Sequence, residues 1–506
     1  MHRGEYIISL DMGTTSTKGM LFRIGEDIVD LSSENYPTHH PSGEIAEQDP
    51  EDVLRAALKV VRTLVRKNSI PEGSIACLVF CGILHSLIPV DRNSSPLTRA
   101  MIWADTRSSA ESHELRRMLD VEEMKRRTGC SIHPLYFPPR LLWLKRHLPD
   151  ITKRTCKYIS IKEYVLHRLY GSTCVDMSTA SGTGMWSMQS RDWDPEMLRI
   201  SGSSSDNFST LVEPTRLLKG LKREHAKEMG IGEATPGVIG AADGPLAHLG
   251  STGLKSGWMS LTIGTSGALR RTVHEPTMLP GREAWCYYFD EDIWILGAVT
   301  HDAGIVMKWF FEQFLKKTLE EGTENLEEAL EEGKSFEVIN RYAGEAPPGS
   351  EGLLFFPFLG GERSPHYNPQ VRGAVMGMSF NHEKKHFVRA LMEGISYRLF
   401  TNYRMLDPGG SMKLVLTGGI LKSPQWMQLT ADFFGKDLLI PTKGESACWG
   451  GVLLGLKALG IVAGYESPAN AHWVSGRIAH DPDRHRVYKD VCSAYEKAYS
   501  SHFLHP

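Results

Sequence analysis

The 506-residue chain lacks a Cys-x-x-Cys pair, a long apolar run and a strong net charge. Its eight cysteines are scattered, which argues against a zinc site or a disulfide framework and indicates reduced thiols in a cytoplasmic protein. The most apolar stretch, Leu78 to Val90, contains His85 and Pro89 and is too short to span a bilayer. A formal net charge of -3 gives no indication of binding to nucleic acid or to a membrane surface. The length predicts two or three domains.

A hairpin near the start of the chain carries most of the chemical information. An apolar strand from Tyr6 to Leu10 and a second short strand ending at Leu21-Phe22 enclose a turn of glycine and small hydroxyl residues. Such a turn offers backbone N–H groups, hydroxyls and an ammonium group to phosphate oxygens. The candidate phosphate-binding residues are Gly13, Thr14, Thr15, Ser16 and Lys18. Asp11, at the strand end, is a hard oxygen ligand suited to Mg²⁺, directly or through water. The alternative is an ordinary hairpin without a ligand.

The second half of the chain repeats this hairpin. The segment Ser260-Leu261-Thr262-Ile263-Gly264-Thr265-Ser266 matches the segment from Ser9 to Thr15 at its Ser, Leu, Gly and Thr positions. Two copies indicate two similar domains that face each other and hold one polyphosphate from both sides, with Gly264 and Thr265 as the second set of contacts. Thr262 replaces Asp11 in the second copy, so only the first copy can help to hold a metal. The duplicated loop resembles those of actin-like ATPases and sugar kinases.

Three candidate substrate-binding residues lie in the first half. His85 lies in the segment Gly82 to Ser86, which directly follows a predicted strand from Ile75 to Cys81. Ligands bind at such strand ends in open α/β sheets. The alternative for His85 is a core histidine with a backbone partner. Trp103 and Asp105 are predicted to share one face at a strand end, where a ring and a carboxylate suit the C–H and hydroxyl groups of a polyol. The alternative is a structural tryptophan and an aspartate that caps a helix.

Two further strand ends are candidates for a base and for nucleotide contacts. Asp243 is predicted to end a buried strand just before a helix, where its carboxylate faces the crevice between the halves. It is then the natural general base for a substrate hydroxyl, although an N-cap role is also compatible with the pattern. Gly418 and Gly419 end another predicted strand, and their side-chain-free surface could accept adenine or ribose.

Three helices are predicted from local signals. Asp49-Pro50 opens a helix that continues to Lys67, because a capping acid and a proline are favoured at that end. Residues Lys316 to Lys334 are strongly acidic and predict a solvated helix face. A helix that begins near Glu445 contains Gly450 and Gly451, whose small size permits close helix packing.

Taken in order, these segments resemble the FGGY family of carbohydrate kinases over nearly the whole chain. Within the family, Leu84 to Ile88, Trp103 to Ser108 and Ile132 to Pro134 look like the substrate segments of the gluconate kinases. Two departures stand out: Arg140 occupies a position where the family normally has Lys, and His301-Asp302-Ala303 occurs where Asn-Gly-Gly is common.

The resemblance implies an α/β fold of two actin-like (ribonuclease H-like) domains with a ligand cleft between them. Residues 1–250 would bind the sugar, and residues 251–506 would bind ATP, with Mg²⁺ near Asp11. The implied reaction is ATP-dependent phosphorylation of the terminal hydroxyl of a sugar acid, D-gluconate to 6-phosphogluconate, with Asp243 as the base. A xylulose kinase or another polyol or ketose kinase is the alternative, and a non-catalytic nucleotide sensor is a third option. The expected partners are ATP and a sugar or sugar acid, and a homodimer is left open.

Overall fold

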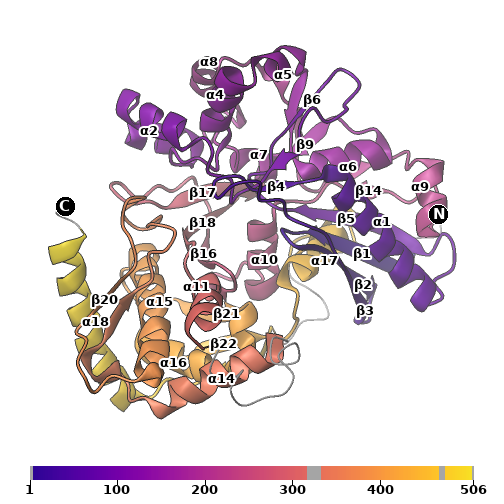
Figure 1. The fold of residues 1–506 in the computed structure, drawn as a ribbon. Helices are drawn as coiled ribbons and strands as arrows, with labels where there is room; N and C mark the ends of the chain where they lie inside the picture. The colour runs from indigo at the N-terminus through magenta and orange to yellow at the C-terminus, as the bar shows by residue number, and fades with distance from the viewer. Residues whose placement is uncertain (1–3, 316–331, 466–472, 504–506) are drawn as a thin grey trace.

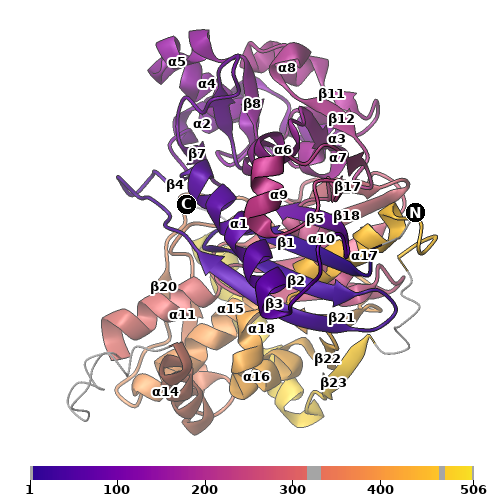
Figure 2. The same cartoon turned by 90° about the vertical axis from the view of Figure 1, so that its right-hand side faces the viewer.

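The computed structural model describes residues 4–315, 332–465 and 473–503. Two mixed β-sheets form its framework, one in each half of the chain (Figure 1, Figure 2). Most of the predicted acidic helix, residues 316–331, lies outside the described residues. All eight cysteines are described and unpaired, as the sequence predicts. Within the described ranges, none of the helices has both the length and the apolar character needed to cross a membrane.

The first sheet is built around the predicted hairpin. Its strands are β1 (Tyr6–Met12), β2 (Ser16–Arg23), β3 (Ile28–Asn35), β5 (Ile75–Gly82), β13 (Leu217–Leu218) and β14 (Gly237–Val238). The order is β13-β14-β5-β1-β2-β3, and β1 pairs antiparallel with β2 and parallel with β5. The strand predicted to reach Asp243 ends at Val238, and only a single parallel bridge between Gly82 and Ala242 continues its direction.

The second sheet repeats the first with one extra strand. Its strands are β15 (Trp258–Ile263), β16 (Gly267–Val273), β17 (Trp285–Asp290), β18 (Ile293–Thr300), β21 (Lys413–Thr417), β22 (Leu438–Pro441) and β23 (Val474–Ile478). The order is β17-β18-β16-β15-β21-β22-β23. Strand β15 corresponds to β1. On one side of these two strands, β16 and β18 correspond to β2 and β3, and on the other side β21, β22 and β23 correspond to β5, β14 and β13. Each corresponding pair of neighbouring strands has the same relative direction. The repeated sequence therefore marks a duplicated sheet, and the predicted α/β class is confirmed.

Two helices pack against each other between the sheets, α10 (Asp243–Thr252) and α17 (Ser446–Ala458), and they lie side by side in both views (Figure 1, Figure 2). A Cβ atom on Gly250 would lie 1.9 Å from the carbonyl oxygen of Ser446, and one on Gly450 would lie 2.0 Å from that of Leu246. The predicted close packing at Gly450 is confirmed. Helix α10 contacts β15 of the second sheet and α17 contacts β1 and β5 of the first, so the two helices join the halves.

Longer helices cover the outer faces of the sheets. Helix α1 (Pro50–Lys67) packs on β2 and β3, and its predicted N-cap is confirmed because the Asp49 carboxylate accepts from the Glu51 N–H at 2.9 Å. On the second sheet, α15 (Lys384–Leu406) packs on β16 and β18, with α16 (Pro424–Phe434) and α18 (Pro482–His502) beside it. Apolar side chains fill the layers between these helices and the sheets.

Shorter elements carry the loops that reach the site. Between β3 and β14 the first half contains β4 (Glu47–Gln48), β6 (Ile88–Val90), β7 (Ala100–Met101), α2 (Ser109–Met118), α3 (Val121–Thr128), α4 (Phe137–His147), α5 (Pro149–Arg154), β8 (Lys157–Ile159), α6 (Ile161–Tyr170), β9 (Cys174–Asp176), α7 (Met177–Ser181), β10 (Trp186–Ser187), β11 (Asp192–Trp193), α8 (Pro195–Ser201), η1 (Ser205–Asn207), β12 (Thr210–Val212) and α9 (Arg223–Met229). The second half adds α11 (Gly304–Phe310), η2 (Phe311–Leu315), α14 (Glu332–Glu345), η3 (Ser350–Gly352), β19 (Leu354–Phe356), β20 (Ala374–Met376) and η4 (Gly419–Lys422). Most of the inserted elements of the first half form the purple lobe at the top of Figure 1.

Candidate active site

The turn of each hairpin is closed by a backbone hydrogen bond that its glycine N–H donates, to the third residue ahead in the first turn and to the second residue ahead in the second turn. The Gly13 N–H donates to the Ser16 carbonyl at 3.0 Å, and the Gly264 N–H donates to the Ser266 carbonyl at 3.0 Å. Within the described residues, the N–H groups of Thr14, Thr15 and Thr265 donate to no other protein atom. Both turns therefore present free backbone donors, which suits phosphate oxygens.

Asp243 lies between the two halves, at the first turn of α10. Its Oδ1 accepts from the Gly244 N–H at 2.8 Å and from the Leu84 N–H at 3.3 Å. The N-cap residue of α10 is Ala242, so Asp243 does not serve as the helix cap. Burial raises the pKa of the Asp243 carboxyl above its usual range, and the nearby Arg270 guanidinium opposes this shift. Arg270 comes from β16, so the second sheet supplies the cation that faces this carboxylate.

Asp11 lies close enough to Asp243 for their charges to interact. Burial, followed by the charge of Asp243, raises the pKa of Asp11 to about 6. The Cys81 thiol donates to Asp11 Oδ1 at 3.3 Å. A bound cation reduces the electrostatic repulsion between two buried carboxylates of this kind. Across the described part of the chain, no group of three or more His, Cys, Asp or Glu residues could hold a metal ion. A cation at Asp11 could take further ligands from water and phosphate oxygens, and an all-oxygen donor set fits Mg²⁺.

Lys18 lies on β2, just after the first turn, but its charge already has a partner. Its Nζ lies 2.7 Å from Glu445 Oε2, immediately before α17. This ion pair connects the first hairpin to the second half. A phosphate that binds Lys18 would have to compete with Glu445.

Gly418 and Gly419 follow β21, next to the second hairpin. Gly418 has a φ of 95°, and a Cβ atom there would lie 2.6 Å from the Ile263 carbonyl oxygen. At Gly419 a Cβ atom would meet nothing within 4 Å. The position of Gly419 is thus open next to the second hairpin, which is compatible with the predicted nucleotide contact.

One ring nitrogen of His85 is hydrogen-bonded, and the ring lies among aromatic neighbours. Its Nδ1 lies 2.8 Å from the Gly182 carbonyl, which can only accept, so Nδ1 carries the proton. Burial lowers the pKa of His85 well below its usual range, so the ring is neutral and Nε2 is an acceptor. The rings of Tyr136 and Tyr287 lie 5.1 and 6.1 Å from the imidazole. His85 therefore has the predicted backbone partner and still offers an acceptor to a hydroxyl group.

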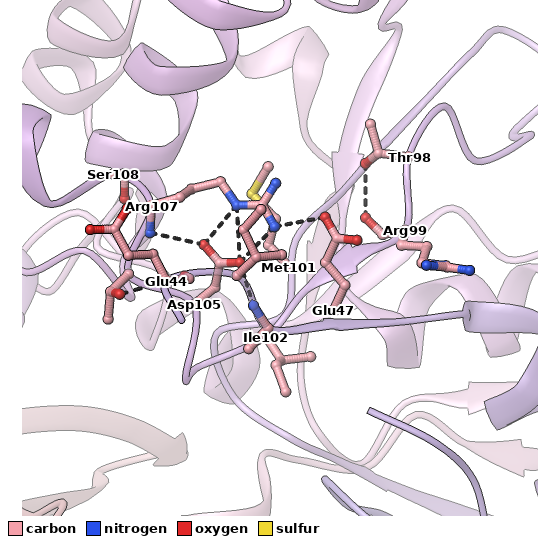
Figure 3. A network of polar contacts seen from close by, with 12 residues as sticks. Glu44, Glu47, Thr98, Arg99, Met101, Ile102, Asp105, Arg107 and Ser108 are labelled. Atoms are coloured by element: carbon pink, nitrogen blue, oxygen red, sulfur yellow. Dashed lines mark hydrogen bonds and ion pairs between the residues drawn. The ribbon is translucent and has the colours of Figure 1, made fainter. Parts of the chain in front are cut away.

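Trp103 and Asp105 do not share the predicted strand face, because β7 ends at Met101. Trp103 Nε1 donates to Thr14 Oγ1 at 2.9 Å, and its ring stacks on His301 of the second half at 5.9 Å. Asp105 is fully buried, and Figure 3 shows its carboxylate against the Arg107 guanidinium. Arg107 lies 2.7 Å from Asp105 and 2.6 Å from Glu47.

The remaining acceptor capacity of Asp105 is also occupied. The Ala46 N–H donates to Asp105 Oδ2 at 2.9 Å, and the Arg107 N–H donates to Oδ1 at 3.3 Å. Because these partners occupy both carboxylate oxygens, the geometry does not support the predicted contact of Asp105 with sugar hydroxyls. Its structural partners give Asp105 a positioning role, since they fix the segment that carries Trp103.

Five further residues surround His85; His133 lies in the predicted substrate segment Ile132 to Pro134, and the other four were not predicted as site residues. The five are His133, Tyr136, Tyr287, His301 and Arg363. The first two belong to the first half and the other three to the second. Arg140, one of the departures from the family pattern, is fully buried and donates to the carbonyl groups of His85, Pro134 and Ile102. It therefore supports the segment around His85 from behind.

Two family models match this chain. The N-terminal domain model of the FGGY family of carbohydrate kinases matches residues 6–250, and the C-terminal domain model matches residues 259–459. The chain belongs to the FGGY family of carbohydrate kinases. Kinases of this family use ATP as the phosphate donor, so this chain is an ATP-dependent carbohydrate kinase.

Individual relatives align with nearly the whole of this chain. It is 36% identical over 466 residues to the gluconokinase of Bacillus subtilis (strain 168), with 92% of this chain and 89% of that protein covered. It is 27% identical over 506 residues to the xylulose kinase of the same organism, with 98% and 97% covered. The crystal structure of gluconate kinase from Lactobacillus acidophilus has a TM-score of 0.88 at 29% identity and 98% coverage of both chains. The predicted two-domain actin-like fold is confirmed.

Proposed function

We propose that this kinase phosphorylates the terminal hydroxyl of D-gluconate and so forms 6-phosphogluconate. The observation that carries the proposal is the position of Asp243. Its carboxylate contacts the Leu84 N–H, beside His85 on one side, and faces Arg270 of the second hairpin on the other. A base at this junction can reach a hydroxyl that points from the first half toward a phosphate held by the second. The gluconokinase relative, at 36% identity, supports gluconate as the sugar.

The two halves divide the substrates between them. Residues 1–250 bind the sugar near His85 and Trp103, and residues 251–506 bind ATP, with the purine beside Gly418 and Gly419. The β- and γ-phosphates lie between the Gly13-Thr14-Thr15 and Gly264-Thr265 turns. Their oxygens accept hydrogen bonds from the free backbone N–H groups of these turns. Lys18 lies beside the first turn. Mg²⁺ near Asp11 neutralises charge on the phosphates when it is bound.

The reaction is an in-line displacement at the γ-phosphorus. Asp243 accepts the proton of the terminal hydroxyl while that oxygen forms its bond to phosphorus and the bond to the ADP oxygen breaks. A buried carboxyl with a raised pKa is a better proton acceptor than an exposed one. The rest of the rate enhancement comes from positioning and from charge neutralisation in a site that excludes water.

A xylulose kinase is the second candidate. The ligand-bound xylulose kinase of Lactobacillus acidophilus also has a TM-score of 0.88 at 29% identity. Both candidates use the same base and phosphate turns, and they differ in whether the substrate carries a charge. A non-catalytic nucleotide sensor is disfavoured because the chain keeps both Asp243 and the paired turns.

The substitution Asp243→Asn tests the assignment of the base. We expect kcat to fall by about 10²- to 10⁴-fold, because an amide cannot take up the proton. The dissociation constant for ATP, measured by calorimetry, is expected to change less than about threefold. The control is Asp292→Asn, which alters an exposed carboxylate paired only with Arg191 at 3.4 Å among the described residues. Near-normal turnover of Asp243→Asn would remove this residue from the mechanism.

A further inference from the structure

Arg363 is a cation without a carboxylate partner at the sugar side of the site. It lies in the loop between β19 and β20 and is half-buried. Its Nη2 donates to the Tyr136 hydroxyl of the first half at 3.4 Å. In the described part of the chain, no Asp or Glu side chain forms an ion pair with it. A partly buried guanidinium is costly to leave unpaired, so this position suits a charged ligand.

The groups around Arg363 leave its charge uncompensated. Burial, and then the charge of Arg363 itself, hold the pKa of His133 well below its usual range and that of His301 at about 3. These two rings lie 5.9 Å apart and are neutral at physiological pH. Glu283 lines the same pocket, but its carboxylate pairs with Arg116 at 3.1 Å. The pocket therefore carries one excess positive charge.

The loop holds Arg363 in a fixed place. The preceding residue, Glu362, is fully buried and pairs with Arg398 and the Tyr499 hydroxyl. Arg398 also donates to the carbonyl of Ser364, the following residue, at 2.6 Å. Both backbone neighbours of Arg363 are thus anchored to α15 and α18. A preorganised guanidinium loses little freedom when it binds a ligand.

We propose that Arg363 binds the carboxylate of the sugar acid and so selects it over an uncharged sugar. The inference rests on the proposed function and names the part of the protein that recognises the acid. Arg363 contacts Tyr136, and the Tyr136 ring contacts His85. The residue before His85 is Leu84, whose N–H donates to Asp243. An extended sugar acid can therefore place its carboxylate at Arg363 and its terminal hydroxyl at Asp243. A guanidinium fork matches the two oxygens of a carboxylate.

The test compares Arg363→Gln, Arg363→Lys and wild type with D-gluconate and with D-glucitol, which replaces the carboxylate by a hydroxymethyl group. For Arg363→Gln we expect the KM for D-gluconate to rise about 10- to 100-fold, the size expected for a lost charge-assisted hydrogen bond. The KM for ATP and the inhibition constant of D-glucitol are expected to stay within about threefold. Arg363→Lys is expected to recover part of the gluconate affinity. Arg282→Gln is the matched control, because Arg282 is exposed and bonds His366 of the same loop at 3.2 Å.

The outcomes separate this inference from the proposed function. If wild type does not phosphorylate D-gluconate, the proposed function and the inference fail together. If wild type does so and Arg363→Gln keeps its gluconate KM, the inference alone fails. An equal loss for D-gluconate, D-glucitol and ATP would also overturn it, because it would indicate a damaged fold in place of a lost carboxylate contact.

Discussion

At the residue scale, burial decides which side chains of the site are charged. Burial, and then the charge of Arg363, lower the pKa values of His85, His133 and His301, so these three rings are neutral. Burial acts in the opposite direction on Asp11, whose pKa rises to about 6. The proposed sugar side is therefore polar and includes the Arg363 guanidinium, and the proposed phosphate side contains two interacting carboxylates.

The same effect predicts acid sensitivity at His248 on α10. This ring is fully buried, bonds Ser260 at 2.9 Å and Thr272 at 3.1 Å, and burial lowers its pKa to about 3. Between pH 6.5 and 3 the unfolded chain binds a proton that the folded chain does not, so the free energy of unfolding falls as the pH falls. By pH 5.5 the loss from this residue is about 1 kcal/mol.

Thermal unfolding at pH 7.5 and 5.5 measures this contribution. The decrease in Tm between the two pH values is expected to be smaller for His248→Gln than for wild type. His40→Gln, at an exposed position, serves as the control and should behave like wild type. An identical pH-dependent decrease in His248→Gln and wild type would contradict the assignment.

The sequence predicted the strand-end residues better than it predicted their partners. His85 and Asp243 were identified because they follow buried segments, a local signal. Asp105 was assigned to the sugar because nothing local indicates that Arg107 and the Ala46 N–H occupy its oxygens. Arg363 was missed because its proximity to Tyr136 depends on how the two halves pack together, which no local sequence pattern indicates.

At the element scale, the crossing of α10 and α17 holds the framework together. These helices are remote in sequence, and each contacts the sheet of the other half. The duplicated hairpins could be predicted because strand and turn patterns are local. The short β14 could not, because its length is set by its neighbours β5 and β13.

The helix crossing predicts a large effect for Gly250→Ala. The added methyl group would overlap the Ser446 carbonyl, so α10 and α17 must separate. We expect a loss of about 3 kcal/mol or more in the free energy of unfolding, seen in calorimetry as a decrease in Tm of several degrees. Gly409→Ala is the control, because a Cβ atom there meets nothing within 4 Å. Equal Tm values for the two variants would show that the crossing tolerates a wider spacing.

At the scale of the whole molecule, the site exists only where the halves meet. The first half supplies Asp11, His85 and Asp243, and the second supplies Arg270 and Arg363. The stack of Trp103 on His301 and the ion pair of Lys18 with Glu445 also connect the two halves. In the proposed mechanism, phosphoryl transfer to a sugar acid therefore requires residues from both copies of the duplicated sheet.

The most direct test of the account is ADP release by the purified kinase with Mg-ATP and D-gluconate, D-xylulose or no sugar. We expect kcat/KM for D-gluconate to exceed that for D-xylulose by about 10-fold or more, since only the acid can pair with the free guanidinium. Release without sugar is expected to be a small fraction of the gluconate rate. Preference for D-xylulose, or equal release with and without sugar, would contradict the account.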